Sequence, residues 1–445
     1  MIARPSPGTH GSRPVGSFSR REFLAASGAL LGGGLLEADT SYLTPPQRLK
    51  PATRKIAVIT TAYHYLSHAY HVCGRFLNGY LRNGQYHYPD FAIAGMYVEQ
   101  QKANDLSREL SQKHGFILAT NVADALTRGR DTLAVDGVLL IGEHGDYPYN
   151  ARLQKLYPRF ELFQKIVDVF RQSGKSVPVF CDKHLSYDRT KAAEMVATSR
   201  KLGFPLMAGS SLPITWRKPE LELPLGVKLE QALVATRGEI EIYGFHGLEA
   251  LQCMVERRAG AENGVKAVTC LEGDAAWKAG DDGVWSWDLL DEAVARTPSR
   301  NCGNIRENCR QFNPPAGRPT YLKGPIAFVI EYRDGFRATV LIINGHIDDT
   351  IFAGKIADQK KPVSTLFFLP PPPGAAFLEA LAIRIEEFLN SGKPPYPVER
   401  TLLTGGILDC ILESRQKGHV RLETPELKIN YSAPRDSGFM GGEYS

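Results

Sequence analysis

The sequence lacks the features that mark a membrane-spanning, disulfide-stapled or nucleic-acid-binding protein. Its longest apolar run, from Phe23 to Leu36, is shorter than the roughly 18 residues that a spanning helix needs. The 7 cysteines form no C-x-x-C pair, and an odd count argues against a complete disulfide framework. Lys and Arg number 53 against 48 Asp and Glu, and a net charge of +5 is too even to indicate nucleic acid or an anionic membrane as partner.

The N-terminal segment has the pattern of an export signal. Residues 19–24, SRREFL, carry Arg20 and Arg21 ahead of a short apolar stretch rich in alanine and glycine, and Ala38 offers a small residue for cleavage. This pattern closely resembles the twin-arginine signal, whose export machinery carries proteins that are already folded, often around a cofactor or metal. We expect a signal peptide over 1–38, a linker over 39–54, and a periplasmic or extracellular mature protein with no membrane anchor after cleavage.

Residues 55–213 alternate short apolar strands with amphipathic helices. Strands are expected at 55–60, 91–98, 116–118, 135–141, 177–180 and 205–208. Helices are expected at 64–81, 100–114, 122–128, 159–173 and 188–202. This alternation is typical of an α/β domain built on a doubly wound, Rossmann-like parallel sheet.

From residue 214 to residue 445 the rhythm changes. Strand-like runs are expected at 238–243, 264–271, 325–332, 336–344 and 364–368, and helices at 248–257, 375–389 and 401–417. The sequence Arg333-Asp334-Gly335 makes a good hairpin turn between two of the strands. We therefore expect an α+β C-terminal domain with an antiparallel sheet.

Four short patterns, in this order along the chain, carry a resemblance to a known family. They are VDGV at 135–138, SVPVFCDKHLS at 176–186, GFHGLE at 244–249, and ERTLLTGGILDCILES at 399–414 followed by VRL at 420–422. Together they resemble the glucose–fructose oxidoreductase and inositol dehydrogenase family. The resemblance implies a homo-oligomer with a C-terminal substrate and oligomerisation domain. It also implies an NAD(P)-dependent oxidoreductase that acts on a sugar, a polyol or a sugar-derived acid.

The same resemblance assigns catalytic roles to two residues, and a third catalytic residue is expected beside them. Lys183 matches the family's catalytic lysine, which orients the substrate hydroxyl or carbonyl, and His246 matches its general acid/base. The family often places an aspartate four residues before that histidine, where this chain has Ile242. Glu249 is the carboxylate expected to stand near His246 instead.

The turn after the first expected strand departs from the nucleotide-binding pattern. Dinucleotide folds need glycines there, so that backbone N–H groups can approach the pyrophosphate. Aligned to G-x-G-x-x-G, residues 60–65 read TTAYHY, with none of the three glycines. NAD(P) is expected at Thr60, Ala62 and Glu99, the last in the place of the acid that binds the ribose hydroxyls. The missing glycines leave this binding open.

Histidines and carboxylates gather in the loops that follow the expected parallel strands. The carboxyl ends of such strands share one edge of the sheet, so His64, Glu143, His144, Asp182 and His184 are expected near one another. Imidazole and carboxylate suit zinc, manganese or iron, and these residues are candidate ligands for a divalent metal. The alternative is that they line a sugar pocket or are buried histidines with satisfied hydrogen bonds.

Two further function classes stay open on the sequence alone. One keeps the fold without the nucleotide: a metal-assisted lyase, isomerase or hydrolase that acts on an extracellular carbohydrate in the same cleft. The other is a binding protein without catalysis, against which the density of titratable groups argues.

Overall fold

A computed structural model describes residues 46, 48–82 and 85–442 of the chain. The expected signal peptide over 1–38 and half of the expected linker over 39–54 lie outside the described residues, so both stay predictions. Within the described part, no helix combines the length and the apolar character needed to cross a bilayer.

The first half of the described chain forms the predicted parallel sheet. Its strands are β1 (Arg54–Thr60), β4 (Phe91–Val98), β5 (Ile117–Ala119), β6 (Gly137–Ile141), β7 (Val179–Asp182) and β8 (Leu206–Gly209), in the order β5-β4-β1-β6-β7-β8. All neighbouring pairs are parallel. The order reverses beside β1, and ligands of such sheets bind at this switch point, outside the carboxyl ends of the strands.

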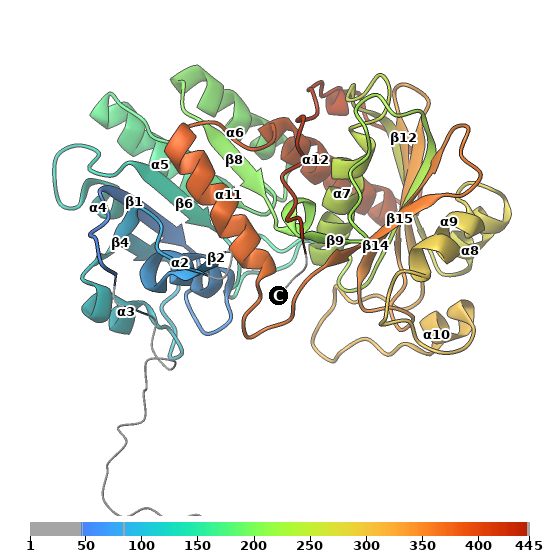
Figure 1. Cartoon of the computed structure of the whole chain (residues 1–445), viewed down its shortest axis with the longest axis horizontal. Coiled ribbons are helices and arrows are strands. Elements are labelled where there is room, and N and C mark those ends of the chain that lie inside the picture. Colours follow the sequence, from blue (N-terminus) through green and yellow to red (C-terminus); the bar gives the residue numbers. More distant parts are fainter. Residues whose placement is uncertain (1–45, 47, 83–84, 443–445) are drawn as a thin grey trace, which may run out of the picture. The chain divides into compact units, whose positions relative to one another are not determined.

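Helices cover both faces of this sheet. They are α2 (His68–Asn78), α3 (Ser107–His114), α4 (Val122–Thr127), α5 (Arg159–Ser173) and α6 (Arg189–Leu202), and a small hairpin of β2 (Tyr80–Arg82) and β3 (Gln85–His87) follows α2. A late helix, α11 (Phe377–Ser391), also lies against the sheet, as Figure 1 shows. Its Leu381 and Ile385 share a core with Ile56 and Val58 of β1, so residues far along the sequence complete the first layer.

The second sheet is mixed. Its strands are β9 (Trp216–Lys218), β10 (Leu229–Thr236), β11 (Val265–Glu272), β12 (Ile326–Tyr332), β13 (Arg337–Ile342), β14 (Thr350–Ile356), β15 (Val363–Phe368) and β16 (Leu422–Glu423), in the order β16-β11-β12-β13-β10-β14-β15-β9. Every pair is antiparallel except β10 and β13. The predicted fold class is therefore confirmed, with one parallel pair that the sequence did not indicate.

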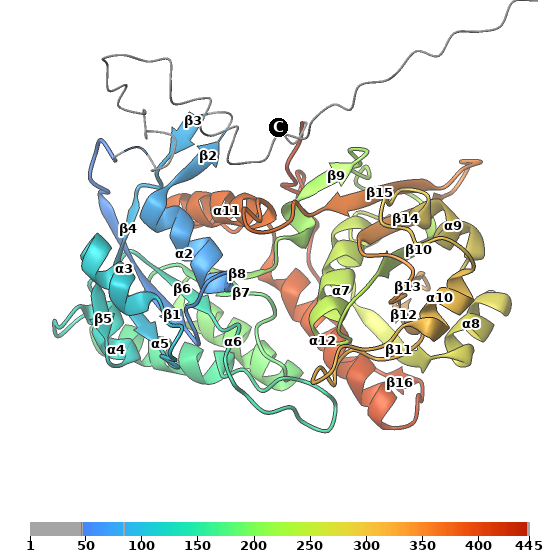
Figure 2. The ribbon, with the colours of Figure 1, turned by 90° about the horizontal axis from the view of Figure 1, so that it is seen from below.

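Helices pack on the two faces of the second sheet, as Figure 2 shows. They are α7 (Ile242–Val255), α8 (Asp274–Asp281), α9 (Trp287–Val294), α10 (Ile305–Gln311) and α12 (Val398–Gln416), with single 3₁₀ turns at Leu212–Ile214 and Pro425–Leu427. Phe245 and Leu251 of α7 and Ile407 of α12 join one face of the sheet in a core. A second core lies under α8 and α9 on the other face.

One expected strand is wrong. Residues 238–243 alternate Glu and Ile as a half-buried strand would, yet α7 begins at Ile242 within this segment. The two carboxylates are held by other parts of the chain: Glu239 accepts hydrogen bonds from Arg318 and Thr320, and Glu241 accepts one from the backbone N–H of Lys155. These long-range contacts override the local alternation, because β propensity depends on context.

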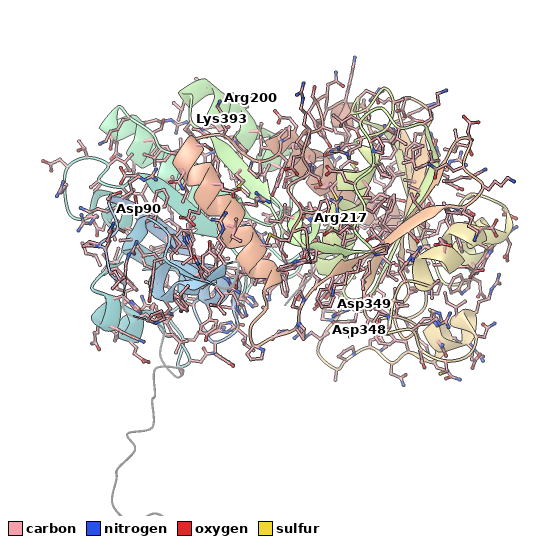
Figure 3. The ribbon with its side chains drawn as sticks, in the orientation of Figure 1. Asp90, Arg200, Arg217, Asp348, Asp349 and Lys393 are labelled. Atoms are coloured by element: carbon pink, nitrogen blue, oxygen red, sulfur yellow. The ribbon has the colours of Figure 1, made fainter. Side chains whose placement is uncertain are left out.

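The half of the chain built on the first sheet and the half built on the second sheet meet along α12 and β9. Thr401 of α12 donates a hydrogen bond to the carbonyl oxygen of Ala208 in β8 at 2.7 Å. Arg217 of β9, labelled in Figure 3, is almost fully buried where the halves meet. Its guanidinium donates to the carbonyl oxygens of Pro213 and Leu221 and lies 4.4 Å from the ring centroid of Phe439.

Candidate active site

A cleft of about 930 Å³ opens at the carboxyl edge of the first sheet and extends to α7. Residues after β1, β4, β6, β7 and β8 line it from one side, and residues at the start of α7 line it from the other. Of the residues predicted for the site, Ala62, His64, Glu143, His144, Asp182, Lys183 and His246 line this cleft. A single concave, polar site formed at the switch point of an α/β sheet is the usual place for a ligand.

Lys183 is fixed by its backbone and by a buried carboxylate. It follows β7 with a φ of 61°, and its N–H donates to the carbonyl oxygen of Gly209 at 3.1 Å. Its Nζ lies 3.3 Å from Oε2 of Glu143, whose other oxygen accepts a hydrogen bond from the fully buried Arg159. Left-handed backbone at a bulky residue is strained, and such strain is concentrated at functional sites.

The charge of Glu143 is set by these two cations. Burial alone would raise the pKa of the Glu143 carboxyl. The positive charges of Lys183 and Arg159 lower it by more, so the pKa falls well below its usual range. Glu143 is therefore ionised at any working pH and neutralises part of the positive charge. Lys183 thus presents an oriented ammonium group to the cleft with its counter-ion already in place.

The histidines beside this cluster do not form a metal site. The ring of His144 lies 5.1 Å from that of His64, and burial lowers the pKa of His144 to about 3. His184 packs against Phe245, and its Nε2 lies 3.5 Å from Arg159. No group of three or more His, Cys, Asp or Glu side chains among the described residues is arranged to hold a metal ion.

The expectation of a divalent metal is therefore not supported by this geometry. The two expected carboxylate ligands have other partners: Glu143 pairs with Lys183 and Arg159, and Asp182 pairs with His68. His184 is not among the residues that line the cleft. Their positions just after the expected strands predicted that these residues lie near one another. The same positions could not predict which side chains form ion pairs.

His246 is connected to a buried carboxylate through a serine. Its Nδ1 lies 3.1 Å from Oγ of Ser210, which follows β8, and the hydroxyl and backbone N–H of Ser210 both bond to Oε2 of Glu249. When Glu249 is ionised, Ser210 donates to it and His246 donates from Nδ1 to Ser210. Nε2 of His246 is then left as an acceptor. The expected carboxylate of Glu249 is therefore present near His246, but the two are linked through Ser210 and not by a direct hydrogen bond.

Glu249 and His246 are both enclosed. Burial raises the pKa of Glu249 to about 7, against the lowering effect of its bonds to Ser210. Burial, followed by the charges of Lys183 and His68, lowers the pKa of His246 well below its usual value. His246 is therefore neutral at neutral pH, and Glu249 is poised to change charge there.

The raised pKa of Glu249 predicts a pH dependence of stability. The folded chain holds a proton on Glu249 up to about pH 7, whereas the unfolded chain releases it near its ordinary value of 4.5, so stability falls as pH rises through this interval. Glu249→Gln should flatten that fall by up to about 3 kcal/mol. Urea unfolding at pH 5 and pH 8 measures it. The exposed Glu230→Gln is the control, and an unchanged pH slope in Glu249→Gln would contradict the prediction.

The residues expected to bind nucleotide are neighbours, with the backbone N–H of Glu99 donating to the carbonyl oxygen of Thr60 at 2.9 Å, but they do not all face the cleft. Thr60 is buried, and its hydroxyl donates to the carbonyl oxygens of Ala62 and Ile141. Ala62 lines the cleft, but Glu99 does not. The Glu99 carboxylate accepts a hydrogen bond from the hydroxyl of Tyr147, in the loop after β6.

The loop after β6 is tied to the end of β4 by further contacts. The side-chain amide of Gln100 bonds to the N–H and the carbonyl oxygen of Asp146, at 2.8 and 3.1 Å, and Lys102 forms an ion pair with Asp146. In this arrangement Tyr147 bonds to one oxygen of the carboxylate that was expected to bind the ribose hydroxyls. Arg159, Ser210 and Tyr147 were missed by the sequence reasoning, because each acts through a tertiary contact that no local pattern marks.

Three solved structures share the fold over most of their length. GenD2 from gentamicin A biosynthesis, in complex with NAD, is 11% identical, with 85% of this chain and 98% of that chain covered and a TM-score of 0.52. A myo-inositol dehydrogenase from Lactobacillus casei, in complex with NAD(H) and myo-inositol, is 11% identical, with 86% and 99% covered and a TM-score of 0.51. A probable dehydrogenase from Thermotoga maritima is 14% identical, with 84% and 99% covered and a TM-score of 0.50.

These likenesses establish the fold. No family model matches the sequence. Comparison with curated proteins likewise gives no match. The chain has the fold of the glucose–fructose oxidoreductase and inositol dehydrogenase family, as the sequence patterns predicted.

Proposed function

We propose that the cleft is the active site of an oxidoreductase that acts on a sugar, a polyol or a sugar-derived acid with NAD(P). The observation that carries the proposal is that Lys183, just after β7, and His246, on α7, line one cleft and match the family's catalytic positions. The shared fold with dehydrogenases crystallised with NAD supports the same function.

Lys183 and His246 have complementary roles in this reaction. Lys183 binds the oxygen of the reacting hydroxyl or carbonyl and stabilises the negative charge that develops on it, because its ammonium group is fixed by Glu143 before the substrate arrives. His246 presents Nε2 as the acid–base atom, with Nδ1 held by Ser210. Ser210 and Glu249 position that ring, and of the two only Ser210 lines the cleft.

The lining of the cleft suits a sugar ring. Its lining includes Tyr147, Tyr149, Tyr157 and Tyr243. Tyrosine combines an apolar face with a hydroxyl group, and a polyol has apolar C–H faces and many hydroxyls. The amide of Gln100 and the side chain of Asn104 add neutral hydrogen-bonding groups on the side of β4.

The fit to NAD(P) is good at one end of the cleft and conditional at the other. When bound, the nicotinamide accepts or returns the hydride. Ala62 and His64 would face the cofactor at the turn after β1, and Lys183 lies where the reacting end would be. Tyr147 donates to Oε2 of Glu99, so its hydroxyl competes with ribose hydroxyls for one of the two oxygens of this carboxylate.

This arrangement predicts that Tyr147→Phe strengthens nucleotide binding. The variant keeps the ring but frees Glu99, and because a hydrogen bond to a charged group contributes on the order of 1.5 kcal/mol, the Kd for NADH or NADPH should fall by roughly tenfold. Titration by nicotinamide fluorescence measures the Kd. Glu99→Gln should reverse the gain in the same background. If the wild-type chain and Tyr147→Phe both fail to bind NAD(P)H at millimolar concentration, the oxidoreductase proposal is wrong.

We further propose that the twin-arginine machinery exports the protein to the periplasm or the outside. The support is the SRREFL segment at 19–24 alone. Arg20→Lys together with Arg21→Lys should leave uncleaved precursor in the cytoplasm, because the paired guanidinium groups are the recognised feature. Cell fractionation with immunoblotting measures this. Replacing Arg4 and Arg13 by Lys is the control, and normal secretion of the Arg20/Arg21 double variant would refute the export proposal.

A further inference from the structure

A second histidine–carboxylate pair lies in the wall of the cleft that the first sheet provides. His68 is the first residue of α2, and its Nδ1 lies 2.6 Å from Oδ2 of Asp182, the last residue of β7. Both residues are among those that line the cleft. The proposed roles of Lys183 and His246 do not use this pair.

The exposure of the two partners is unequal. The Asp182 side chain is fully buried, and its Oδ1 has no hydrogen-bond partner among the described residues. The His68 side chain is 21% exposed, and no described residue bonds to its Nε2. Burying a carboxylate while one of its oxygens accepts no hydrogen bond lowers the stability of the fold. A contact that only held α2 against β7 would not compensate for that loss.

The geometry of the pair fixes what His68 can do. Asp182 accepts the hydrogen of Nδ1, which determines the tautomer and leaves the lone pair of Nε2 directed away from the carboxylate. His68 is therefore oriented as a proton acceptor, on a side chain that is 21% exposed in a residue that lines the cleft.

The neighbouring histidines are not placed to accept this proton as His68 is. Charged or titratable neighbours within electrostatic reach are His71 on its own helix, Glu143 and His144 in the loop after β6, Asp182 on β7 and His246 on α7. Burial lowers the pKa values of His71, His144 and His246, which keeps these three rings neutral. Among these four histidines, only His68 has a carboxylate in direct contact.

We propose that His68, oriented by Asp182, is a second proton-transfer residue of the cleft and carries the reaction proton between the cleft and solvent. This inference rests on the proposed oxidation of a substrate alcohol. In that oxidation the O–H and C–H bonds break, a C=O bond forms, and the C–H electron pair leaves as hydride to NAD(P)⁺. One proton is released per turnover from an enclosed site, and His68 passes it out through its exposed edge. The reverse reaction takes it in.

The chain offers a matched control outside the cleft. His87, in β3, has Nε2 2.8 Å from Oε2 of Glu386, and its side chain is 31% exposed. It is a histidine–carboxylate pair of similar exposure, but it does not line the cleft. Its ring is held at the other nitrogen, so its neutral tautomer is the opposite of that expected for His68.

The first measurement is the tautomer of each ring, read from ¹⁵N-histidine NMR spectra of the mature chain. The neutral ring of His68 should carry its proton on Nδ1 and that of His87 on Nε2, and Asp182→Asn should abolish the preference at His68 alone. A proton on Nε2 of neutral His68 in the wild-type chain would overturn the inference, whatever the activity.

The second measurement is turnover in a screen of sugars, polyols and aldonic acids with NAD⁺ and NADP⁺. His68→Ala should lower kcat by at least about tenfold with KM within about threefold, and imidazole buffer should restore part of the loss, because a small base in solution replaces the shuttle. Asp182→Asn should lower kcat similarly, and His87→Ala should not. A His68→Ala kcat within threefold of wild type would overturn the inference. If no compound is turned over, the proposed function fails and the tautomer alone decides the role of His68.

Discussion

Lys183→Met should lower kcat/KM on the best substrate by about 10²–10³-fold while the chain remains folded. The substitution keeps the length and apolar part of the side chain and removes the ammonium group that faces the cleft. Glu143 keeps its bond to Arg159, so the substitution does not leave an unpaired buried carboxylate. Because the lost charge acts mainly on the oxygen of the transition state, most of the effect should fall on kcat. Steady-state kinetics measures both constants.

Lys155→Met is the matched control. Lys155 lines the same cleft, but its Nζ lies over the rings of Tyr149 and Tyr157, at 5.7 and 5.3 Å from their centroids, and pairs with no carboxylate in the described structure. Its loss should change kcat/KM by less than about tenfold, the size of a cation–π contact at a partly exposed site. Equal effects of the two substitutions would mean that Lys183 contributes only general positive charge to the cleft.

The fold was predictable from sequence because periodicity reports burial. The strands β1, β4 and β6 are apolar runs buried on both faces, and α5 spans 159–173 as its pattern indicated. The segment 238–243 failed because the carboxylates of Glu239 and Glu241 are held by residues distant in sequence. The parallel pairing of β10 with β13 has no local signal at all.

The site was predictable in membership but not in connectivity. Topology brings loops after parallel strands to one edge, which is why Lys183, His144 and Asp182 line one cleft. Which donor bonds to which acceptor depends on differences in atomic position of less than about an ångström. The sequence therefore could not show that His68 takes Asp182, or that Ser210 stands between His246 and Glu249.

A second large effect is expected outside the cleft lining, at the buried ion pair of Arg400 and Glu256. Both side chains are fully buried, Nε of Arg400 lies 2.9 Å from Oε2 of Glu256, and a second guanidinium nitrogen bonds to Oε1. Arg400→Met should lower the free energy of unfolding by about 3–5 kcal/mol, because the Glu256 carboxylate would stay buried with only the hydroxyl of Tyr431 as a donor. Urea unfolding followed by circular dichroism measures the loss.

The double variant Arg400→Met with Glu256→Leu separates the two possible causes of that loss. If the cost comes from the stranded carboxylate, removing Glu256 as well should recover most of it, because a buried pair and an apolar pair of similar volume differ little in stability. If the cost comes from lost packing against Tyr396, whose ring centroid lies 4.4 Å from the guanidinium, the double variant should be no more stable than Arg400→Met.

Arg421→Met supplies the surface comparison. Arg421 makes a similar two-point contact with Glu331, at 2.7 and 2.8 Å, with a side chain 41% exposed, so its loss should cost no more than about 1 kcal/mol.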